Sequence, residues 1–399
     1  MTSESARERE KMQPYNDIAL VAPVSLPYER RSERGAAWFT GTAFARMLDR
    51  AGLQKHDIDG LTIASFTLAP DSVVSMTEYL DISPGWLEQI PMGGASGPVA
   101  VRRAARAVQA GDAEIVACIG ADTASADTFA DLVQNFSRFS TDAVFPYGAG
   151  GPNTVFAMIT RNYMEKYGAE REDFGRVCIA QRENALAAGT AVFNKPLSME
   201  DYLAARPISE PLHLFDCVMP VAGADGFLAM TVARAEALGL SYARVLSAGE
   251  RHNAWPDDDV HFRAGWRLYR DQMYELAELG PGDMDFLQTY DDYPVISMIQ
   301  MEDLGFCEKG EAAEFVRTRP LTWNGGGLPH NTRGGQLSAG QAGAAGGFLG
   351  TVEAIRQLTE SGLPNQVAGA KNGMASGYGM VNYDRCLCTS AVILGRGGE

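Results

Sequence analysis

The chain has 399 residues, of which 46% are hydrophobic and 21% charged, a globular composition with ample apolar material for a core. Its net charge of −16 disfavours nucleic acid and anionic membrane surfaces as partners, because both require a basic footprint. Six cysteines are scattered without a CxxC pair or a histidine at zinc spacing. We therefore expect reduced, mostly buried thiols and no metal site.

The first residues, 1–16, are polar and charged and contain no apolar segment, so they predict a flexible tail rather than a signal peptide. No run of eighteen apolar residues occurs in the sequence, and a membrane span is not expected. Together these features predict a cytoplasmic protein.

The first half of the chain alternates apolar runs of strand length with segments of helical periodicity. Strands are predicted at 17–24, 58–68, 88–92 and 114–121, and helices at 35–52, 73–80 and 98–110. The last of these helices follows the segment GGASG at 93–97 and has Pro98 in its first turn, where proline is tolerated.

Residues 122–212 interrupt this alternation with aromatic residues and turns, and with helical segments at 154–167 and 172–188. We interpret them as an inserted lobe that caps a site. A strand-like pattern returns at 216–233.

The second half repeats the order of the first. It predicts strands at 242–248, 284–290, 366–374 and 388–394, and helices at 262–279, 295–304 and after a glycine-rich loop to 358. Strands that alternate with helices favour largely parallel sheets. The repeated order indicates a duplication into halves 17–240 and 241–399, which predicts two sheets packed through the glycine-led helices. The site is expected where the N-termini of these helices meet.

The glycine-rich loop spans 323–349 and also contains Trp323, His330, Asn331 and Gln341. Glycine at this density serves either a flexible linker or a loop that must turn tightly or approach another group closely. The aromatic and amide side chains, and the apolar helix that follows, favour a loop that lines a site.

Three motifs resemble the thiolase superfamily, and more narrowly its lipid-transfer-protein-like thiolases and steroid side-chain aldolases. They are GASG at 94–97, YDDY at 290–293 and NTRGGQLSAGQ at 331–341. The resemblance covers nearly the whole chain from residue 17. It implies a five-layer αβαβα fold with two mixed sheets, a tunnel for an acyl-CoA and a homodimer. It also implies a possible small partner protein with an OB-fold and a zinc ribbon.

The departures from the thiolase motifs concern the catalytic residues. Gly94 stands where thiolases have the nucleophilic cysteine, and Gln341 and Tyr290 stand at the positions of two histidines. Thiolysis needs a thiolate and a base, so thiolase chemistry is not expected. The aldolase branch also lacks the cysteine and is thought to use tyrosine for proton transfer. Tyr290 matches one such tyrosine, whereas the second should fall near Gln341 and is absent from this sequence.

Tyr290 and Asp291 follow a predicted buried strand, where sites of α/β proteins lie. Tyr290 is the candidate for proton transfer, with Asp291 tuning it, and a core tyrosine that caps a backbone carbonyl is the alternative. For Asp292 we favour a role as N-cap of the helix at 294–304.

Oxyanion contacts are expected from Asn331, Gln341 and the backbone near Gly94, and His330 is a further candidate catalytic residue. The alternative for His330 is a loop histidine bonded to the backbone, and the alternative for Asn331 is a residue in a left-handed turn. The alternative for the glycines near Gly94 is that they serve only to let two helices pack closely. The missing side chain at Gly94 is expected to leave volume for substrate. The candidate substrate-binding residues are Gly94, Ser96, Gly335 and Tyr378, the last in a predicted glycine turn at 375–379.

We therefore expect an enzyme that cleaves a carbon–carbon bond of a CoA thioester by retro-aldol chemistry, without an acyl-cysteine. No bound cofactor is expected, and CoA enters as part of the substrate. The alternatives are an acyltransferase that uses another nucleophile, and a catalytically silent lipid-binding or scaffold subunit.

Overall fold

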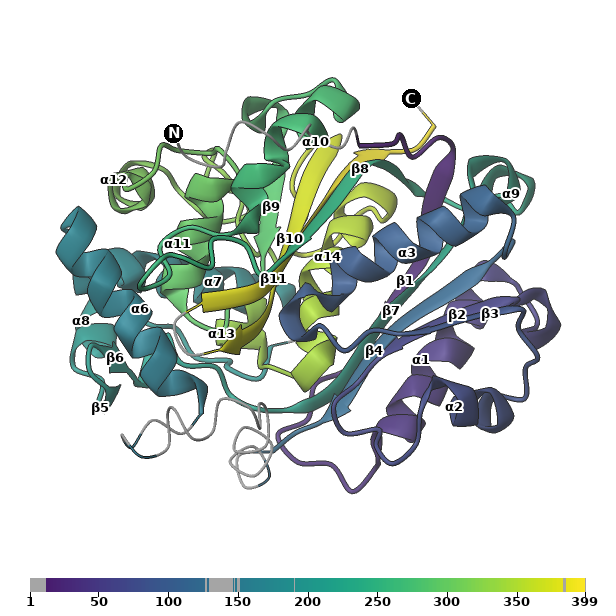
Figure 1. Cartoon of the computed structure of the whole chain (residues 1–399), viewed down its shortest axis with the longest axis horizontal. Coiled ribbons are helices and arrows are strands. Elements are labelled where there is room, and N and C mark those ends of the chain that lie inside the picture. Colours follow the sequence, from purple (N-terminus) through teal and green to yellow (C-terminus); the bar gives the residue numbers. More distant parts are fainter. Residues whose placement is uncertain are drawn as a thin grey trace.

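The computed structural model describes residues 12–125, 128, 146, 148, 151–189, 191–382 and 385–398. Residues 1–11 of the predicted tail lie outside the described residues, and so does much of the predicted capping lobe between 126 and 150. In Figure 1 the N-terminal half (purple to blue) lies on the right and the C-terminal half (green to yellow) on the left.

Nine strands form one sheet in the order β3-β2-β4-β7-β1-β8-β11-β10-β9. The N-terminal half contributes β1 (Ile18–Ser25), β2 (Gly60–Ala64), β3 (Trp86–Gln89), β4 (Val116–Thr123) and β7 (Ala222–Thr231). The C-terminal half contributes β8 (Ala243–His252), β9 (Phe286–Thr289), β10 (Asn372–Asn382) and β11 (Arg385–Arg396).

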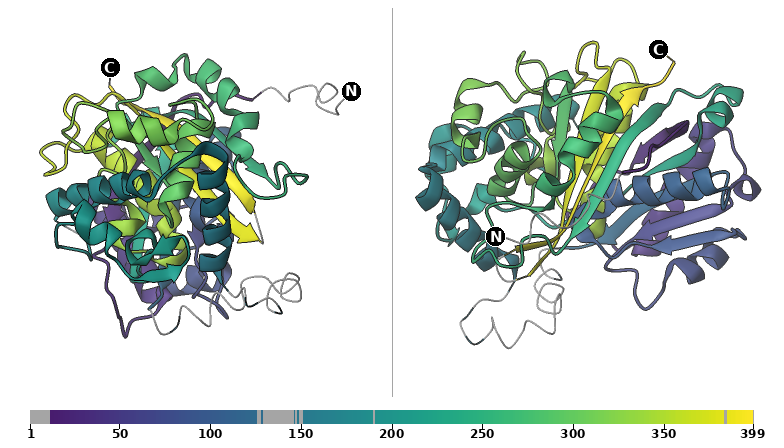
Figure 2. Two further views of the ribbon diagram at one scale, coloured as in Figure 1. Left: turned by 90° about the vertical axis from the view of Figure 1, so that its left-hand side faces the viewer. Right: turned by 45° about the horizontal axis from the view of Figure 1, so that its top comes forward.

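The two halves of the sheet join where β1 pairs with β8 over only two residue pairs, Ala19 with Arg244 and Leu20 with Ala243. The sheets expected as two separate units are thus continuous at this seam (Figure 2, right). Three ladders of the large sheet are parallel and five are antiparallel, so the expectation of largely parallel sheets is wrong.

Helices α3 (Ser96–Ala110) and α14 (Gly346–Thr359) lie side by side at the centre of the molecule, in contact with strands of both halves (Figure 1). Their apolar faces form a central core that includes Val99, Phe227 and Phe348. Helix α1 (Ala36–Ala51) covers the outer face of the N-terminal strands, beside α2 (Val73–Leu80). Helices α10 (Arg270–Ala277) and α11 (Pro294–Asp303) contribute to a third core on the C-terminal side. This arrangement confirms the thiolase-like α/β fold.

The two central helices approach so closely that only glycine fits at their crossing. A Cβ at Gly97 would lie closer than 3.0 Å to the carbonyl oxygen of Gly347, a separation that real Cβ atoms do not show. The glycine-led helices therefore meet at their N-termini, as the duplicated pattern predicts.

The strand prediction fails in one place near the C-terminus. Strand β10 begins at Asn372, later than predicted, and runs straight through the expected glycine turn at 375–379. Gly377 and Gly379 are needed there because their α-carbons face the backbone of residues 92–95 too closely for a side chain. The glycines mark a close approach of two segments, which a single sequence does not distinguish from a turn.

Helix α9 (Val232–Ala237) packs against β1 and β7 of the N-terminal half. The remaining helices and short strands lie beside the C-terminal half (Figure 1), and they are α6 (Pro152–Tyr167), α7 (Arg171–Ala188), α8 (Met199–Leu203), β5 (Pro207–Ser209), β6 (Leu212–His213), α12 (Ala312–Thr318) and α13 (Gly335–Ala339). Within the described residues, no helix is both long and apolar enough to cross a membrane.

Candidate active site

Tyr290 directly follows β9, where its backbone is held from two sides. Its amide donates to the carbonyl of Ser376 at 3.0 Å, which extends the pairing with β10. Its carbonyl accepts a hydrogen bond of 2.7 Å from the side chain of Gln300 on α11, and Ser376 donates to Gln300 in turn at 2.7 Å. These contacts fix the direction in which the phenol ring leaves the strand.

The Tyr290 ring occupies the space beside Gly94 that a side chain would need. A Cβ at Gly94 would lie closer than 3.0 Å to two ring carbons of Tyr290 and to the carbonyl oxygen of Tyr378. The expectation that glycine here leaves volume for substrate is therefore wrong, because the ring fills that volume. The glycine and the tyrosine are two parts of one packing arrangement.

Gln341 holds the Tyr290 hydroxyl, and its orientation follows from its other contacts. The amide of Gly343 donates to the Gln341 Oε1 at 3.1 Å, so the Nε2 points the other way. The Nε2 donates to the Tyr290 hydroxyl oxygen at 3.3 Å and to the Gly343 carbonyl at 3.3 Å. Since the Tyr290 oxygen accepts from Gln341, its own proton is directed to a different partner.

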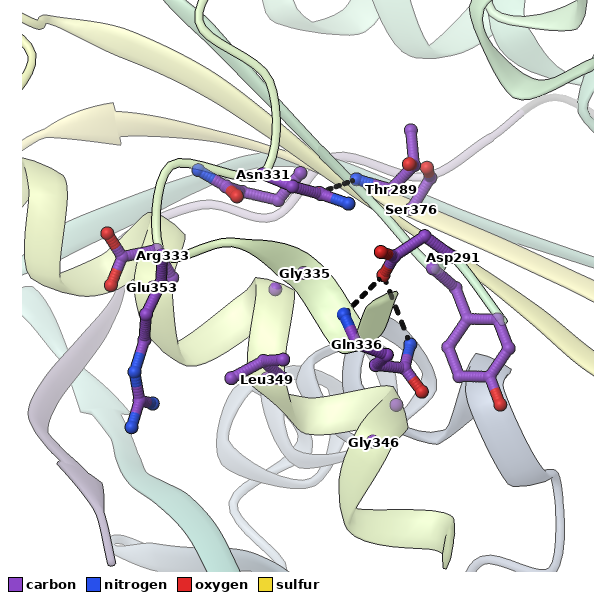
Figure 3. A pocket seen from close by; sticks show the side chains of 14 residues that line it. Thr289, Asp291, Asn331, Arg333, Gly335, Gln336, Gly346, Leu349, Glu353 and Ser376 are labelled. Carbon is purple, nitrogen blue, oxygen red and sulfur yellow. Dashed lines mark hydrogen bonds between the residues drawn. The ribbon is translucent and has the colours of Figure 1, made fainter. Parts of the chain in front are cut away.

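Asp291 points to the start of helix α13. Its Oδ1 accepts from the Gln336 amide at 2.8 Å (Figure 3). Its Oδ2 accepts from the Leu337 amide at 3.2 Å. Burial raises the pKa of this carboxyl well above its usual value, and the two amide donors oppose the shift. Asp291 therefore caps helix α13, because its carboxylate accepts hydrogen bonds from two amides that would otherwise be unpaired.

Asp292 does not cap the helix that follows it. The residue at the N-cap of α11 is Tyr293, and no side chain caps that helix, so the expected capping role of Asp292 is wrong. Burial raises the pKa of Asp292 to about 7. The Asp292 Oδ1 is buried without a hydrogen-bond partner in the described structure.

Tyr290 is itself a protonated phenol at neutral pH. Burial raises its pKa well above the usual value, the charge of Asp292 raises it further, and the hydrogen bond from Gln341 lowers it. The Tyr290 hydroxyl therefore accepts from Gln341, and burial is the main reason that it keeps its proton.

His330 and Asn331 lie beside β9 rather than beside the Tyr290 hydroxyl. The ring of His330 is fully buried, its Nε2 is 2.7 Å from the Thr289 hydroxyl, and burial lowers its pKa to about 3. Asn331 has φ 45°, the left-handed turn conformation weighed as its alternative. Its Oδ1 accepts from the Thr289 amide at 2.8 Å (Figure 3), while its Nδ2 is buried without a described partner.

The candidate substrate-binding residues are not all in one place. Gly335 lies at the start of α13 against Asp291, and Ser96 is fully buried at the start of α3. The Tyr378 ring packs among Phe156, His261 and Trp266, while its carbonyl faces Gly94.

A small polar crevice lies behind Asp291, between β9, α13 and α14 (Figure 3). It brings together four of the predicted site residues, Tyr290, Asp291, Asn331 and Gly335. The other residues that line it are Gln288, Thr289, Arg333, Gln336, Gly346, Gly347, Leu349, Gly350, Glu353 and Ser376.

The pair of adjacent aspartates in YDDY predicts that one of them faces the site, because adjacent side chains at the end of a strand point in opposite directions, but it does not show which one contacts α13. Gln336 was missed, since helix α13 is only five residues long and carries no periodic pattern.

Comparison with known proteins identifies the superfamily to which the chain belongs. Residues 251–396 match the family model described as thiolase C-terminal domain-like. A solved structure described as the Ltp2-ChsH2(DUF35) aldolase superposes with a TM-score of 0.82 at 28% identity, covering 96% of this chain and 98% of that one. The fold and the motifs therefore define a member of the thiolase superfamily.

Two characterised relatives narrow this assignment. The 17-hydroxy-3-oxo-4-pregnene-20-carboxyl-CoA lyase of Mycobacterium tuberculosis is 32% identical, with 94% of this chain and 98% of the relative covered. The steroid side-chain-cleaving aldolase of Thermomonospora curvata is 30% identical, with 92% and 95% covered. The chain belongs to this family of thiolase-like, side-chain-cleaving aldolases.

Proposed function

We propose that the protein cleaves a β-hydroxyacyl-CoA by a retro-aldol reaction, releasing a shorter acyl-CoA and a ketone or aldehyde. The observation that carries this proposal is the Tyr290 ring in the space beside Gly94. The position where thiolases carry the nucleophile here holds a phenol, which moves protons and does not take up an acyl group.

Retro-aldol cleavage needs the β-hydroxyl to lose its proton and the thioester carbonyl to be stabilised as an enolate. Tyr290 is a buried, hydrogen-bonded phenol and serves as the group that exchanges a proton with substrate. Gln341 orients its hydroxyl, and Asn331 retains an amide donor for an oxyanion. A fixed donor in a buried site stabilises developing negative charge without reorganisation.

Acyl transfer through a cysteine is the weaker candidate, because burial keeps the thiols protonated. It raises the pKa of Cys217, Cys307 and Cys386 to about 12 in each case. The thiolate is the nucleophilic form, so these side chains are poor acyl acceptors at neutral pH.

The nature of the acyl chain is proposed from the relatives. Both named relatives act on steroid side chains, and in the lyase the hydroxyl at carbon 17 is β to the thioester carbonyl. We propose a substrate of the same kind, with a tertiary β-hydroxyl on a bulky ring system. A homodimer, a cytoplasmic location and a small OB-fold, zinc-ribbon partner are proposed with it, the partner because the superposed aldolase is described as a complex.

The test incubates the purified protein, alone and coexpressed with a candidate OB-fold partner, with 17-hydroxy-3-oxo-4-pregnene-20-carboxyl-CoA and with simpler β-hydroxyacyl-CoAs. Mass spectrometry is expected to show a shortened CoA thioester and the matching ketone in equal amounts, and no acyl adduct on the protein. An acyl-cysteine, or cleavage of 3-oxoacyl-CoAs that depends on free CoA, would show acyl transfer instead.

A further inference from the structure

A buried carboxylate lies at the end of strand β4, where the N-terminal half of the sheet approaches the start of helix α14 (Figure 1). It belongs to Asp122, whose side chain is fully buried. A carboxylate that leaves water is costly unless hydrogen bonds or a partner charge compensate for the lost solvation. The groups that compensate Asp122 therefore show what this side chain holds in place.

One oxygen of Asp122 holds the loop that follows β2. Its Oδ1 accepts from the Ser65 hydroxyl at 2.9 Å and from the Phe66 amide at 2.9 Å. It also accepts from the amide and the hydroxyl of Thr67, at 2.7 and 2.6 Å. The Phe66 ring in turn lies against Gly93, where an added Cβ would be 3.4 Å from it. This oxygen therefore fixes a loop of the N-terminal half that packs against the glycine turn before α3.

The other oxygen of Asp122 holds the loop that leads into helix α14. Its Oδ2 accepts from the Ala344 amide at 2.6 Å. A Cβ added at Gly343 would lie closer than 3.0 Å to the same oxygen, so the backbone passes directly over the carboxylate. Gly343 has φ 53°, a conformation that glycine adopts without strain. A residue of the N-terminal half thus sets the position of a loop of the C-terminal half.

The loop held by Asp122 is the one that orients Gln341. The Gly343 amide donates to the Gln341 Oε1 at 3.1 Å, and the Gly343 carbonyl accepts from the Gln341 Nε2 at 3.3 Å. The same Nε2 donates to the Tyr290 hydroxyl at 3.3 Å. Residues 341–344, joined by peptide bonds and by these hydrogen bonds, thus connect the Asp122 carboxylate to the phenol.

We propose that Asp122 is a positioning residue of the reaction, because it fixes the loop through which Gln341 holds the Tyr290 hydroxyl. The inference rests on the proposed retro-aldol function and adds to that same site a residue from the other half of the chain. Asp122 accepts its hydrogen bonds from protein groups on both oxygens, so it holds geometry and does not exchange protons with substrate. A displacement of about 1 Å at a reacting group can cost roughly 10² in rate.

Asp122→Asn is expected to break the connection on one side only. An asparagine keeps one acceptor oxygen, and the loop at 65–67 offers more donors than the Ala344 amide does. The oxygen is therefore expected to remain on the side of the 65–67 loop, which turns the Nδ2 toward Ala344. Two donors then face each other, so residues 341–344 are expected to move away from the strand.

The experiment is a double-mutant cycle on kcat with Asp122→Asn and Gln341→Leu. We expect Asp122→Asn to lower kcat by roughly 10²-fold with KM nearly unchanged, because a displaced phenol impairs the reaction more than substrate binding. Gln341→Leu removes the hydrogen bond to Tyr290, so the double variant is expected to be no slower than Gln341→Leu alone. Effects that act through one contact are not additive in free energy, whereas independent effects multiply in rate. A double variant that is slower by the full factor of Asp122→Asn would overturn the inference, although the retro-aldol function would stand.

The matched control is Asp59→Asn, at the opposite end of the same two strands. The Asp59 carboxylate accepts from the amides of Glu114 and Ile115, each at 2.8 Å, so it joins the starts of β2 and β4 as Asp122 joins their ends. Its variant is expected to lose stability and to keep the wild-type kcat. An Asp59→Asn variant as slow as Asp122→Asn would show that a loosened sheet is enough to slow the reaction, which contradicts the proposal.

Fluorine NMR of protein labelled with 3-fluorotyrosine tests the connection without turnover. The resonance that is missing from labelled Tyr290→Phe identifies Tyr290. We expect this resonance to move in Asp122→Asn and to stay in place in Asp59→Asn. An unmoved Tyr290 resonance in folded Asp122→Asn would overturn the inference whether or not the protein cleaves a β-hydroxyacyl-CoA. Absence of cleavage by the wild-type protein would overturn the function itself.

A second variant keeps the test open if Asp122→Asn does not fold. Thr67→Val removes the hydroxyl that donates to the Asp122 Oδ1 at 2.6 Å and leaves the carboxylate in place. The Tyr290 resonance is expected to move by a smaller amount, and kcat to fall less than in Asp122→Asn, with no further fall in the Gln341→Leu background. A Thr67→Val protein with an unmoved resonance and the wild-type kcat counts against the proposal.

Discussion

Tyr290 shows what a short motif can and cannot reveal about a site. The YDDY motif after a buried apolar run was enough to single out Tyr290 as a candidate. It was not enough to say what each of the two following carboxylates contacts. The contacts of each carboxylate depend on the direction of its side chain after β9 and on the position of helix α13, whose unpaired amides Asp291 caps. Both are set by tertiary contacts from residues more than forty positions away.

Removing the Tyr290 hydroxyl is expected to abolish most of the activity with little loss of stability. Tyr290→Phe retains the ring that packs beside Gly94 and removes the proton. Turnover is expected to fall by roughly 10²–10⁴, the usual worth of general acid–base help, with the melting temperature nearly unchanged. Full activity on an accepted substrate, with normal melting, would identify Tyr290 as a packing residue only.

The ionisation of Asp292 is expected to reduce stability as pH rises. Its folded-state pKa of about 7 lies above the ordinary aspartate value of 3.8, so the folded protein binds the proton more tightly than the unfolded chain. The protonated Asp292 contributes its full stabilisation below about pH 4, and this contribution is lost as pH rises through about 7. Asp292→Asn is expected to melt about 2–5 °C above wild type at pH 8 and to show a smaller difference at pH 5. A constant difference across this range would contradict the assigned pKa.

Regular elements with a clear hydrophobic period were predicted well, whereas glycine-rich segments were not. Helices α1, α2, α6 and α7 and strands β1 and β4 agree with the predicted segments to within two residues at each end. The segment 375–379 was taken for a turn because it contains glycines. In the structure Gly377 and Gly379 lie in strand β10 against the start of α3. A glycine in a strand indicates that another group lies close to its α-carbon, but the sequence does not identify that group.

The helix crossing at Gly97 is expected to be the least tolerant of the glycine contacts. A Cβ there meets the carbonyl of Gly347 and the hydroxyl of Thr351, so Gly97→Ala must push the two central helices apart. Overpacking of this kind destabilises proteins by roughly 1–3 kcal/mol or more. The control is Gly35→Ala, because Gly35 has φ −82° and nothing lies within 4 Å of its added Cβ. Denaturant unfolding of both variants measures the difference, and equal stabilities would show that the helices are free to move apart.

The duplication visible in the sequence predicted the relation of the two halves but not how they join. The order of elements predicts two similar halves packed through glycine-led helices, and α3 and α14 pack against each other as expected. The seam between β1 and β8 was not predictable, because its two residue pairs carry no pattern different from ordinary strand ends. The core around α3 and α14 contains residues of both halves, so these two helices also join the halves.

The open edge of the sheet at β3 is the expected site of dimerisation. The amides of Trp86 and Ile90 donate toward β2, so the amide of Gln89 faces away from the sheet. We expect a homodimer in which β3 pairs with its counterpart, since an unpaired edge strand invites such pairing. Gln89→Pro removes one outward amide and is expected to weaken the dimer. Gln89→Ala, which loses only the side-chain contact to Val73, serves as its control.

Light scattering over a range of concentrations measures both variants. A monomeric wild-type protein at micromolar concentration, or a Gln89→Pro dimer as tight as that of Gln89→Ala, would exclude pairing through β3.

The packing of Tyr290 against Gly94 also restricts how this chemistry can be gained or lost in the course of evolution. A cysteine at 94 and a tyrosine at 290 exclude each other, since the ring lies where the first atom of the thiol side chain would be. Gly94→Cys alone should therefore disrupt folding rather than revive thiolysis, and a tyrosine placed beside an existing cysteine should do the same. A lineage that passed from acyl transfer to aldol cleavage had to lose its nucleophile first and tolerate an empty space before the phenol filled it. The ancestor at that step would have had neither the cysteine at 94 nor the tyrosine at 290, and its site would have been available for other side chains.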